Sequence, residues 1–250
     1  PFGLFQSLPD AVKIMLKEDI IPTGADKWVF NIAPVLSVLS AMLVWVVVPF
    51  SAGWTGSDLS IGVLYLIAAG SLSTIAVMMA GWSSNNKYAL LGAFRGVAQL
   101  ISYEIPMLLA LLVPVLLAGS LSLQDIVQNQ HIMYLFAVPL TVVIFIISSL
   151  AEMGRAPFDL LEAESELVAG FMVEYSSTPY LLFMLGEYVA IVTMCALASI
   201  LFLGGWLPPV DIWPLNAVPG IFWFAAKVVF MFFMFAMAKA MVPRYRYDQL

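Results

Sequence analysis

The feature that most constrains this chain is a series of six apolar segments, each long enough to cross a lipid bilayer. A transmembrane helix needs about 20 predominantly apolar residues, and the segments are 31–50, 60–82, 95–118, 131–151, 178–203 and 216–238. Each segment is apolar around its whole circumference, which is typical of a helix surrounded by lipid and other helices. We therefore expect an all-α fold: a polytopic bundle of about six transmembrane helices that forms a single membrane domain over residues 1–250.

The composition agrees with this fold and excludes several classes of function. Hydrophobic residues make up 62% of the 250 residues and charged residues 10%, whereas a soluble domain carries about 25% charged residues. A formal net charge of -6 offers no basic surface for nucleic acid. Because the chain has one cysteine, Cys195, it cannot by itself form a disulfide framework, an iron–sulfur cluster or a cysteine-based zinc site. We expect no metal ion and no covalently bound cofactor.

The basic residues lie on alternate loops. Residues 51–59, 119–130 and 204–215 contain no Lys or Arg, and nine of the ten basic residues fall on or beside the other connections. Cytoplasmic loops of membrane proteins are enriched in Lys and Arg. We therefore expect both ends of this chain and the loops 83–94 and 152–177 to face the cytoplasm.

Residues 4–17 differ from the apolar segments. Apolar residues recur there at steps of three and four, opposite polar and charged ones, which predicts an amphipathic helix. The segment is too short and too charged to cross a membrane. Two placements suit it equally: the cytoplasmic surface of the membrane, or the surface of a partner protein.

Four ionisable residues lie inside or at the edge of the apolar segments: Glu104, Glu152, Glu187 and Lys227. A charge within a bilayer is costly, and such residues usually pair with one another or mark the route of an ion or a proton. We predict that these four residues take part in proton transfer. The alternative is that they pair only to hold helices together.

The densest polar region is the loop 152–177, which we call the acidic loop. It contains one base, Arg155, and six acids: Glu152, Asp159, Glu162, Glu164, Glu166 and Glu174. Carboxylates crowded in this way repel one another and share protons. A charge run is more often a solvated surface, but apolar residues such as Phe158 and Phe171 interrupt this one. We therefore expect the loop to pack against other parts of the protein.

Four sequence blocks, in order along the chain, resemble those of one known family. They are GLxQxxxDAxKxxxKE at 3–18, RxxxQxISYE at 95–104, a block with RAPFD and ELVAG at 151–176, and PRYRYDQL at 243–250. Together they resemble the H-type membrane subunit of bacterial NADH:quinone oxidoreductase, or respiratory complex I, the counterpart of the mitochondrial ND-type subunit that contains the quinone tunnel. Leu161 departs from the Pro that is common in the family. The resemblance implies eight transmembrane helices, so we expect the family's first and last helices to lie outside residues 1–250.

The resemblance also implies roles for individual residues. Glu104, Glu152 and Glu187 match membrane carboxylates that carry protons away from the quinone region. The acids that match the loop beside the quinone tunnel are Glu162, Glu164, Glu166 and Glu174. The charged residues that match the tunnel or its funnel are Asp10, Lys13, Lys17, Glu18, Arg95, Arg155, Asp159, Lys239, Arg244 and Arg246.

The implied function is that of the membrane subunit of a proton-pumping enzyme. Quinone is the expected substrate, and NADH, flavin and iron–sulfur clusters are expected in partner subunits of complex I. The expected location is the lipid bilayer of the bacterial inner membrane, or the mitochondrial inner membrane. The alternatives are the related subunit of a membrane-bound hydrogenase-type complex, a non-catalytic membrane anchor, and an autonomous channel or transporter. We further predict that the acidic loop is a switch that couples quinone chemistry to protonation.

Overall fold

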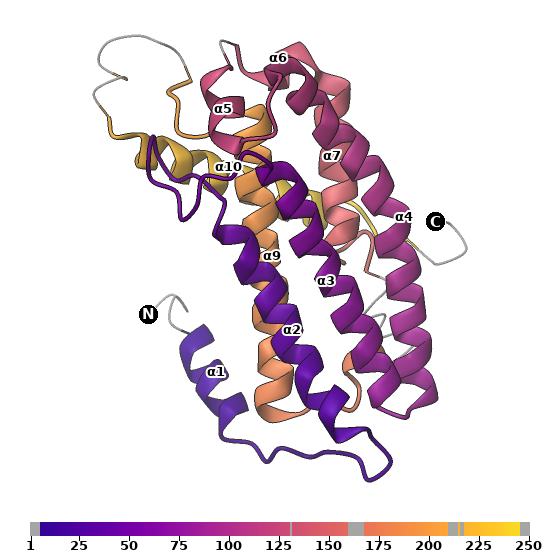
Figure 1. Ribbon diagram of the computed structural model, residues 1–250. Helices are drawn as coiled ribbons and strands as arrows, with labels where there is room; N and C mark the ends of the chain where they lie inside the picture. Colours follow the sequence, from indigo (N-terminus) through magenta and orange to yellow (C-terminus); the bar gives the residue numbers. More distant parts are fainter. Residues whose placement is uncertain (1–5, 131, 160–167, 210–214, 216–217, 246–250) are drawn as a thin grey trace.

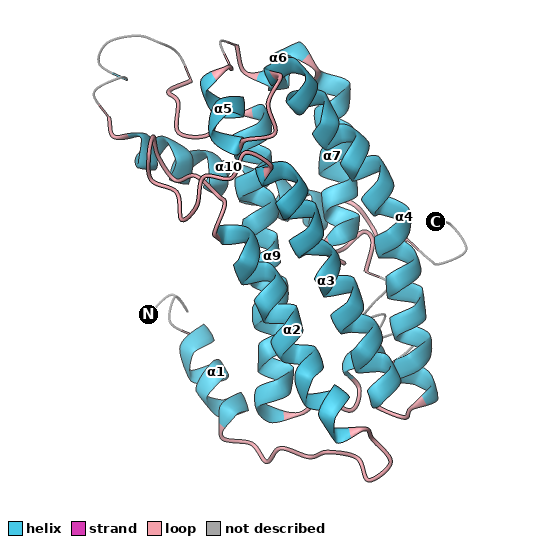
Figure 2. Ribbon diagram, in the orientation of Figure 1, coloured by secondary structure: helices cyan, strands magenta, loops and turns pink. Residues whose placement is uncertain are grey.

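A computed structural model describes residues 6–130, 132–159, 168–209, 215 and 218–245, and these form a bundle of helices (Figure 1). Five helices in this part of the chain are long and apolar enough to cross a membrane: α2 (Lys27–Trp45), α3 (Gly62–Ser83), α4 (Lys87–Ala118), α9 (Ser177–Phe202) and α10 (Gly220–Met241). A sixth apolar helix, α7 (Pro139–Glu152), is shorter. Figure 2 shows helices and loops throughout the described chain. The predicted all-α membrane bundle is confirmed.

The long helices pack closely because small residues lie between them. Helices α2, α3 and α4 lie side by side, α9 packs on α2, α7 packs on α4, and α10 crosses behind α9 at a steep angle (Figure 1). A Cβ atom added to Gly81 would collide with the Cβ of Ala93, and one added to Gly186 would lie 2.8 Å from the Oγ of Ser37. Such contacts bring backbones together where lipid offers no hydrophobic driving force.

The predicted span 131–151 is wrong in its first half. The structure has a single turn there, α6 (Tyr134–Ala137), and a new helix, α7, which begins at Pro139. Val138, between them, has φ -134° and ψ 61°, outside the helical region. Proline lacks a backbone N–H and disfavours helix in the residue before it. The 14 residues of α7 therefore span about 21 Å at 1.5 Å per residue, less than a bilayer core of about 30 Å.

Other helix boundaries differ from the predicted ones for local reasons. Helix α4 begins at Lys87 and not at 95, because the Asn86 side chain accepts a hydrogen bond from Tyr88 N (2.9 Å) and caps the helix. The loop 119–130 contains a helix that the sequence did not reveal, α5 (Leu123–Gln128). The amphipathic helix expected at 4–17 is present as α1 (Ser7–Met15).

The loops without basic residues meet at one end of the bundle. The Oγ of Ser122, beside α5, donates a hydrogen bond to Oδ1 of Asp58 in the α2–α3 connection (3.3 Å). The Nε2 of Gln130 donates to the carbonyl oxygens of Ile200 and Leu201 in the last turn of α9 (3.0 and 2.9 Å). These three connections therefore share one side, as the alternation of charge requires. The orientation of that side in a membrane stays a prediction.

Candidate functional site

The acidic loop begins with a tightly held turn. We call residues 151–159 the RAPFD turn; they comprise the last two residues of α7 and the seven that follow. Gln99 on α4 donates two hydrogen bonds to it from Nε2, to the carbonyl oxygens of Ala151 (2.7 Å) and Phe158 (2.8 Å). The ring of Phe158 lies 5.3 Å from that of Tyr103, one helical turn further along α4. The start of the acidic loop is therefore docked on α4, as its apolar residues led us to expect.

The C-terminal block of the chain also contacts the RAPFD turn. The backbone N–H of Tyr245 donates to the carbonyl oxygen of Pro157 (3.0 Å), and its ring lies 5.7 Å from that of Phe158. This contact brings the neighbouring Arg244 to the same region. Arg246 lies outside the described residues. Two of the four sequence blocks thus meet in space, although the contacting residues Tyr245 and Pro157 are 88 positions apart.

An ion pair joins the RAPFD turn to α9. The Nη2 of Arg155 lies 3.2 Å from Oε2 of Glu187, and the two side chains are 18% and 22% exposed. The guanidinium also lies over the ring of Tyr188, 5.1 Å from its centroid, where the ring quadrupole attracts a cation. Lys239 and Arg155 line one cavity of about 140 Å³, so the end of α10 lies near Arg155. Arg155 therefore contacts Glu187 directly and shares a cavity with Lys239.

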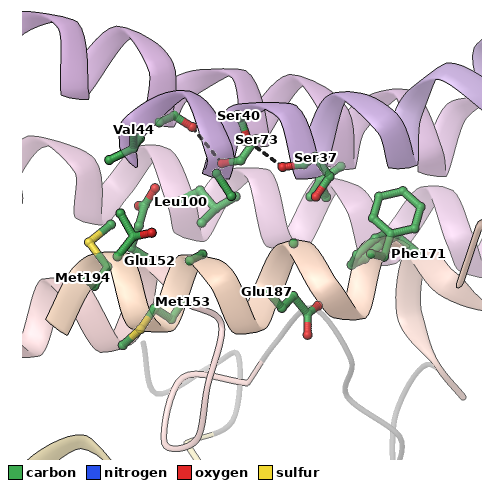
Figure 3. Close-up of a pocket in the computed structure, with 17 residues that line it drawn as sticks. Ser37, Ser40, Val44, Ser73, Leu100, Glu152, Met153, Phe171, Glu187 and Met194 are labelled. Carbon is green, nitrogen blue, oxygen red and sulfur yellow. Dashed lines mark hydrogen bonds between the residues drawn. The ribbon is translucent and has the colours of Figure 1, made fainter. Parts of the chain in front are cut away.

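A cavity of about 120 Å³ lies among α2, α3, α4 and α9, and both Glu152 and Glu187 line it (Figure 3). Besides the two carboxylates, its wall carries hydroxyl groups from three helices. Three of these hydroxyls donate their hydrogen to a carbonyl of their own helix: Ser40 to Ser37 (2.7 Å), Ser73 to Gly70 (2.8 Å) and Thr193 to Val189 (2.7 Å). The hydroxyl oxygens therefore remain free to accept, and the space is large enough for several waters.

Glu152 lies between this cavity and a second one. The second cavity, of about 60 Å³, is lined by Glu104 and Glu152 together with mainly apolar residues of α2, α3, α4, α7 and α9. The Oε2 atom of Glu152 is buried and has no hydrogen-bond partner among the described residues. Buried polar atoms normally have a partner, so this carboxylate has unused capacity for a water or a proton. The structure thus connects Glu104, Glu152 and Glu187 through adjoining cavities.

Lys227 is not brought to these glutamates. Its Nζ donates to the carbonyl oxygens of Leu203 (2.6 Å), Gly205 (2.9 Å) and Leu207 (2.6 Å), and the residue is 8% exposed. An ammonium group has three donors, so all are used at the C-terminal end of α9, where a cation is favourable. Leu203 follows Glu187 by 16 positions, which is about 24 Å along a helix.

The acidic loop is anchored at its far end as well. Glu174 accepts a hydrogen bond from Nδ2 of Asn86 (2.5 Å). The ring of Tyr175 stacks on Phe30 at 4.0 Å, and its hydroxyl donates to the carbonyl oxygen of Phe30 (3.2 Å). Burial raises the pKa of Tyr175 to about 12, against the opposing effect of its hydrogen bond with Ser83. The phenol therefore keeps its proton at physiological pH and remains a donor.

The remaining predicted residues fall into two groups. Asp10, Lys13, Lys17 and Glu18 are exposed on or beside α1, whose end is tied to α9 by the hydrogen bond from Ser177 Oγ to the Lys17 carbonyl (2.8 Å). Arg95 is half-buried on α4, one turn before Gln99, and Asp159 ends the RAPFD turn with a buried Oδ1 that has no hydrogen-bond partner among the described residues. The acids Glu162, Glu164 and Glu166 lie outside the described residues.

Sequence reasoning missed two kinds of site residue. The first kind consists of neutral residues, namely Gln99 and the hydroxyl residues of the cavity wall. These residues carry no charge that would mark them within an apolar segment. A signal for Gln99 was available: it is an amide within an apolar segment, between Arg95 and Glu104. The second kind is the anchoring pair Asn86 and Tyr175, which no spacing in the sequence connects. In the described part of the chain, no group of three or more His, Cys, Asp or Glu residues could hold a metal ion.

Comparison with known proteins assigns the family. The family model described as NADH dehydrogenase matches residues 1–250. The chain is 58% identical to the second H subunit of NADH-quinone oxidoreductase from Rhodopseudomonas palustris (strain HaA2), over 100% of this chain and 75% of that protein. It is 56% identical to the H subunit from Bradyrhizobium diazoefficiens and 54% identical to the one from Nitrobacter hamburgensis, with the same coverage. The resemblance drawn from the four sequence blocks is thus confirmed, and the chain belongs to the family of NADH-quinone oxidoreductase H subunits.

Proposed function

We propose that this chain is the membrane subunit of a proton-pumping NADH:quinone oxidoreductase, and that it couples quinone reduction to proton translocation. The observation that carries the proposal is the row of carboxylates Glu187, Glu152 and Glu104, which adjoining cavities connect through Glu152. Ionisable residues inside a membrane bundle mark proton routes. A purely structural anchor has no need of a buried carboxylate without a hydrogen-bond partner.

The residues suggest how protons would move. Reduction of a quinone to a quinol consumes electrons and protons, so a demand for protons arises where the quinone reacts. The acidic loop supplies carboxylates on the side where we propose that the quinone reacts, and the Arg155–Glu187 pair joins the loop to α9. A proton that reaches Glu187 could pass through waters held by the hydroxyl oxygens of Ser40, Ser73 and Thr193 to Glu152. From there the route continues to Glu104.

The proposal includes partners and location. We propose that quinone enters beside the acidic loop, and that peripheral subunits on the cytoplasmic side carry the NADH site, flavin and iron–sulfur clusters. The charged residues of α1 and of the C-terminal block, which lie at the loop's end of the bundle, would line the quinone route. The names of the relatives, all NADH-quinone oxidoreductase subunits, favour this enzyme over a hydrogenase-type complex. The proposed membrane is the bacterial inner membrane, with α1 and the end of α10 on its cytoplasmic side.

The test is the variant Glu152→Gln in the whole complex. Glutamine keeps the size and polarity of the side chain but cannot carry a proton, so we expect the complex to assemble and NADH-driven proton translocation to fall at least tenfold. The control is Asp125→Asn, which changes an exposed acid at the opposite end of the bundle and should leave turnover unchanged. Unchanged quinone reduction and an unchanged number of protons per NADH in Glu152→Gln would contradict the proposed route.

A further inference from the structure

We propose that Gln99 is a positioning residue for this reaction: its amide holds the RAPFD turn closed and so sets the placement of Glu152 and Arg155. The inference rests on the proposed function of those two residues and extends it to a neutral side chain. We call the two hydrogen bonds from Gln99 Nε2, to the carbonyl oxygens of Ala151 and Phe158, the Gln99 bridge.

The geometry of the bridge leaves little freedom to the turn. Gln99 is 3% exposed, and both its partners are carbonyl oxygens, so both amide hydrogens must point toward the turn. The partners are seven residues apart, one in the last turn of α7 and the other beyond the cis peptide bond between Ala156 and Pro157. One side chain of α4 therefore ties both ends of the turn to the same point.

The residues between the two ends are those that the proposed reaction uses. Glu152 directly follows the first bridged residue, and Arg155, which pairs with Glu187, lies at the centre of the turn. If the bridge opened, the carboxylate of Glu152 would leave its place between the two cavities, and the Arg155 guanidinium would leave α9. The bridge thus controls the positions of two side chains that the proposed reaction uses.

The surroundings of the bridge are short of hydrogen-bond donors. Three buried oxygens there have no partner among the described residues: Gln99 Oε1, Glu152 Oε2 and Asp159 Oδ1. Two of them belong to the residues that directly follow the bridged ones. A proton on either carboxylate converts an acceptor into a donor. The Gln99 bridge therefore holds these two carboxylate oxygens beside the proposed proton route.

A second glutamine provides a matched control. Gln130 is 6% exposed, its Nε2 also donates to two carbonyl oxygens, those of Ile200 (3.0 Å) and Leu201 (2.9 Å), and its Oε1 also has no partner among the described residues. It lies at the opposite end of the bundle, away from the three glutamates. A purely structural role predicts equal effects of removing either amide, whereas a positioning role is specific to Gln99.

The first arm of the experiment measures the turn directly and does not depend on turnover. In a Cys195→Ser background, Met153→Cys places a thiol in the RAPFD turn at a position that is 8% exposed. With the whole complex in membranes, we expect Gln99→Leu to accelerate the reaction of this thiol with a permeant maleimide at least tenfold. We expect Gln130→Leu to leave the reaction rate unchanged. A thiol at Ala156, which is half-buried, serves as a second reporter. An unchanged reaction rate at both reporters in Gln99→Leu would overturn the proposal that the bridge holds the turn closed.

The second arm measures the reaction per assembled complex. We expect Gln99→Leu to lower kcat for NADH-driven quinone reduction, to change KM for quinone, and to lower the number of protons translocated per NADH. Gln130→Leu should alter only the yield of complex. If Gln99→Leu opens the turn but keeps wild-type kcat, KM and proton ratio, or if both variants lose the same activity, the positioning role is wrong. Normal pumping by Glu152→Gln would instead overturn the proposed function, and the maleimide rates would still report on the bridge.

Discussion

Arg155 and Glu187 form an ion pair of 3.2 Å across the junction between the acidic loop and α9. Each side chain is about four-fifths buried, and the ring of Tyr188 covers the guanidinium. A partly buried charge that loses its partner is left with an uncompensated desolvation cost. Moving the loop away from α9 would therefore cost free energy.

The first prediction concerns this pair. Arg155→Met should destabilise the loop contact and slow quinone reduction, and Glu187→Gln added to it should cause less further loss than it does alone. A double-mutant cycle on turnover per assembled complex should give a coupling of about 0.5–3 kcal/mol. Lys27→Met, which removes an exposed base at the start of α2, is the control. Strictly additive effects would mean that the two side chains act independently.

The second prediction concerns the contact of α4 with the far end of the acidic loop. A Cβ atom at Gly92 would lie 2.9 Å from the backbone of Gly170 and 3.0 Å from the N atom of Phe171. Gly92→Ala should therefore push the loop outward and cost about 1–3 kcal/mol, seen as a lower unfolding temperature of the complex. A Cβ atom at Gly70 would meet no other atom of the described residues within 4 Å. Gly70→Ala should therefore leave the unfolding temperature equal or higher, because Ala favours helix. Equal effects of the two variants would contradict the close contact.

The third prediction separates two roles for Lys227. Lys227→Met leaves three carbonyl oxygens without a donor, and each buried group that loses its partner costs about 1–3 kcal/mol. We expect a lower yield and a lower unfolding temperature of the complex, with the number of protons per NADH unchanged in what assembles. The measurement is proton translocation normalised to assembled complex. A lower ratio at normal yield would instead support proton transfer by Lys227, as the sequence led us to predict.

The fourth prediction concerns orientation. The loops without Lys or Arg should face away from the cytoplasm, so a membrane-impermeant maleimide added outside should label a cysteine at Asp125 and should not label one at Lys87. Both positions are exposed in the structure, and Cys195→Ser removes the native thiol. Labelling at Ser57, in the α2–α3 connection, should follow that at Asp125. The reverse pattern would invert the membrane orientation that we propose.

The sequence predicted the fold and pointed to the carboxylates of the membrane helices because both leave strong one-dimensional signals. Apolar length identified most of the spans, and Glu104, Glu152 and Glu187 stood out as charges in apolar surroundings. The break at Val138 was missed because Pro139 lies in an apolar run that a membrane bundle can tolerate. The early start of α4 was missed because Lys87 and Arg95 interrupt the apolar pattern there.

The contacts that organise the site could not be predicted from spacing. Gln99 is neutral, and its partners are backbone carbonyls, which every residue has. The Asn86–Glu174 and Tyr245–Pro157 contacts join residues about 88 positions apart, so they depend on how the helices pack. Lys227 was correctly found as a buried charge, but the sequence does not show that the end of α9 folds back to surround it with carbonyl oxygens.

The length of α4 has a consequence for membrane depth. Its 32 residues measure about 48 Å at 1.5 Å per residue, whereas the hydrocarbon core is about 30 Å thick. With Ala118 at one boundary of the core, an upright α4 would cross the other boundary near Gln99, and even a tilted helix would carry its first turns into water. The same helix thus places Glu104 in the hydrocarbon core, Gln99 near its boundary, and Gly92 about 10 Å beyond that boundary. A thicker or thinner bilayer would therefore change the distance between the docked acidic loop and the membrane surface.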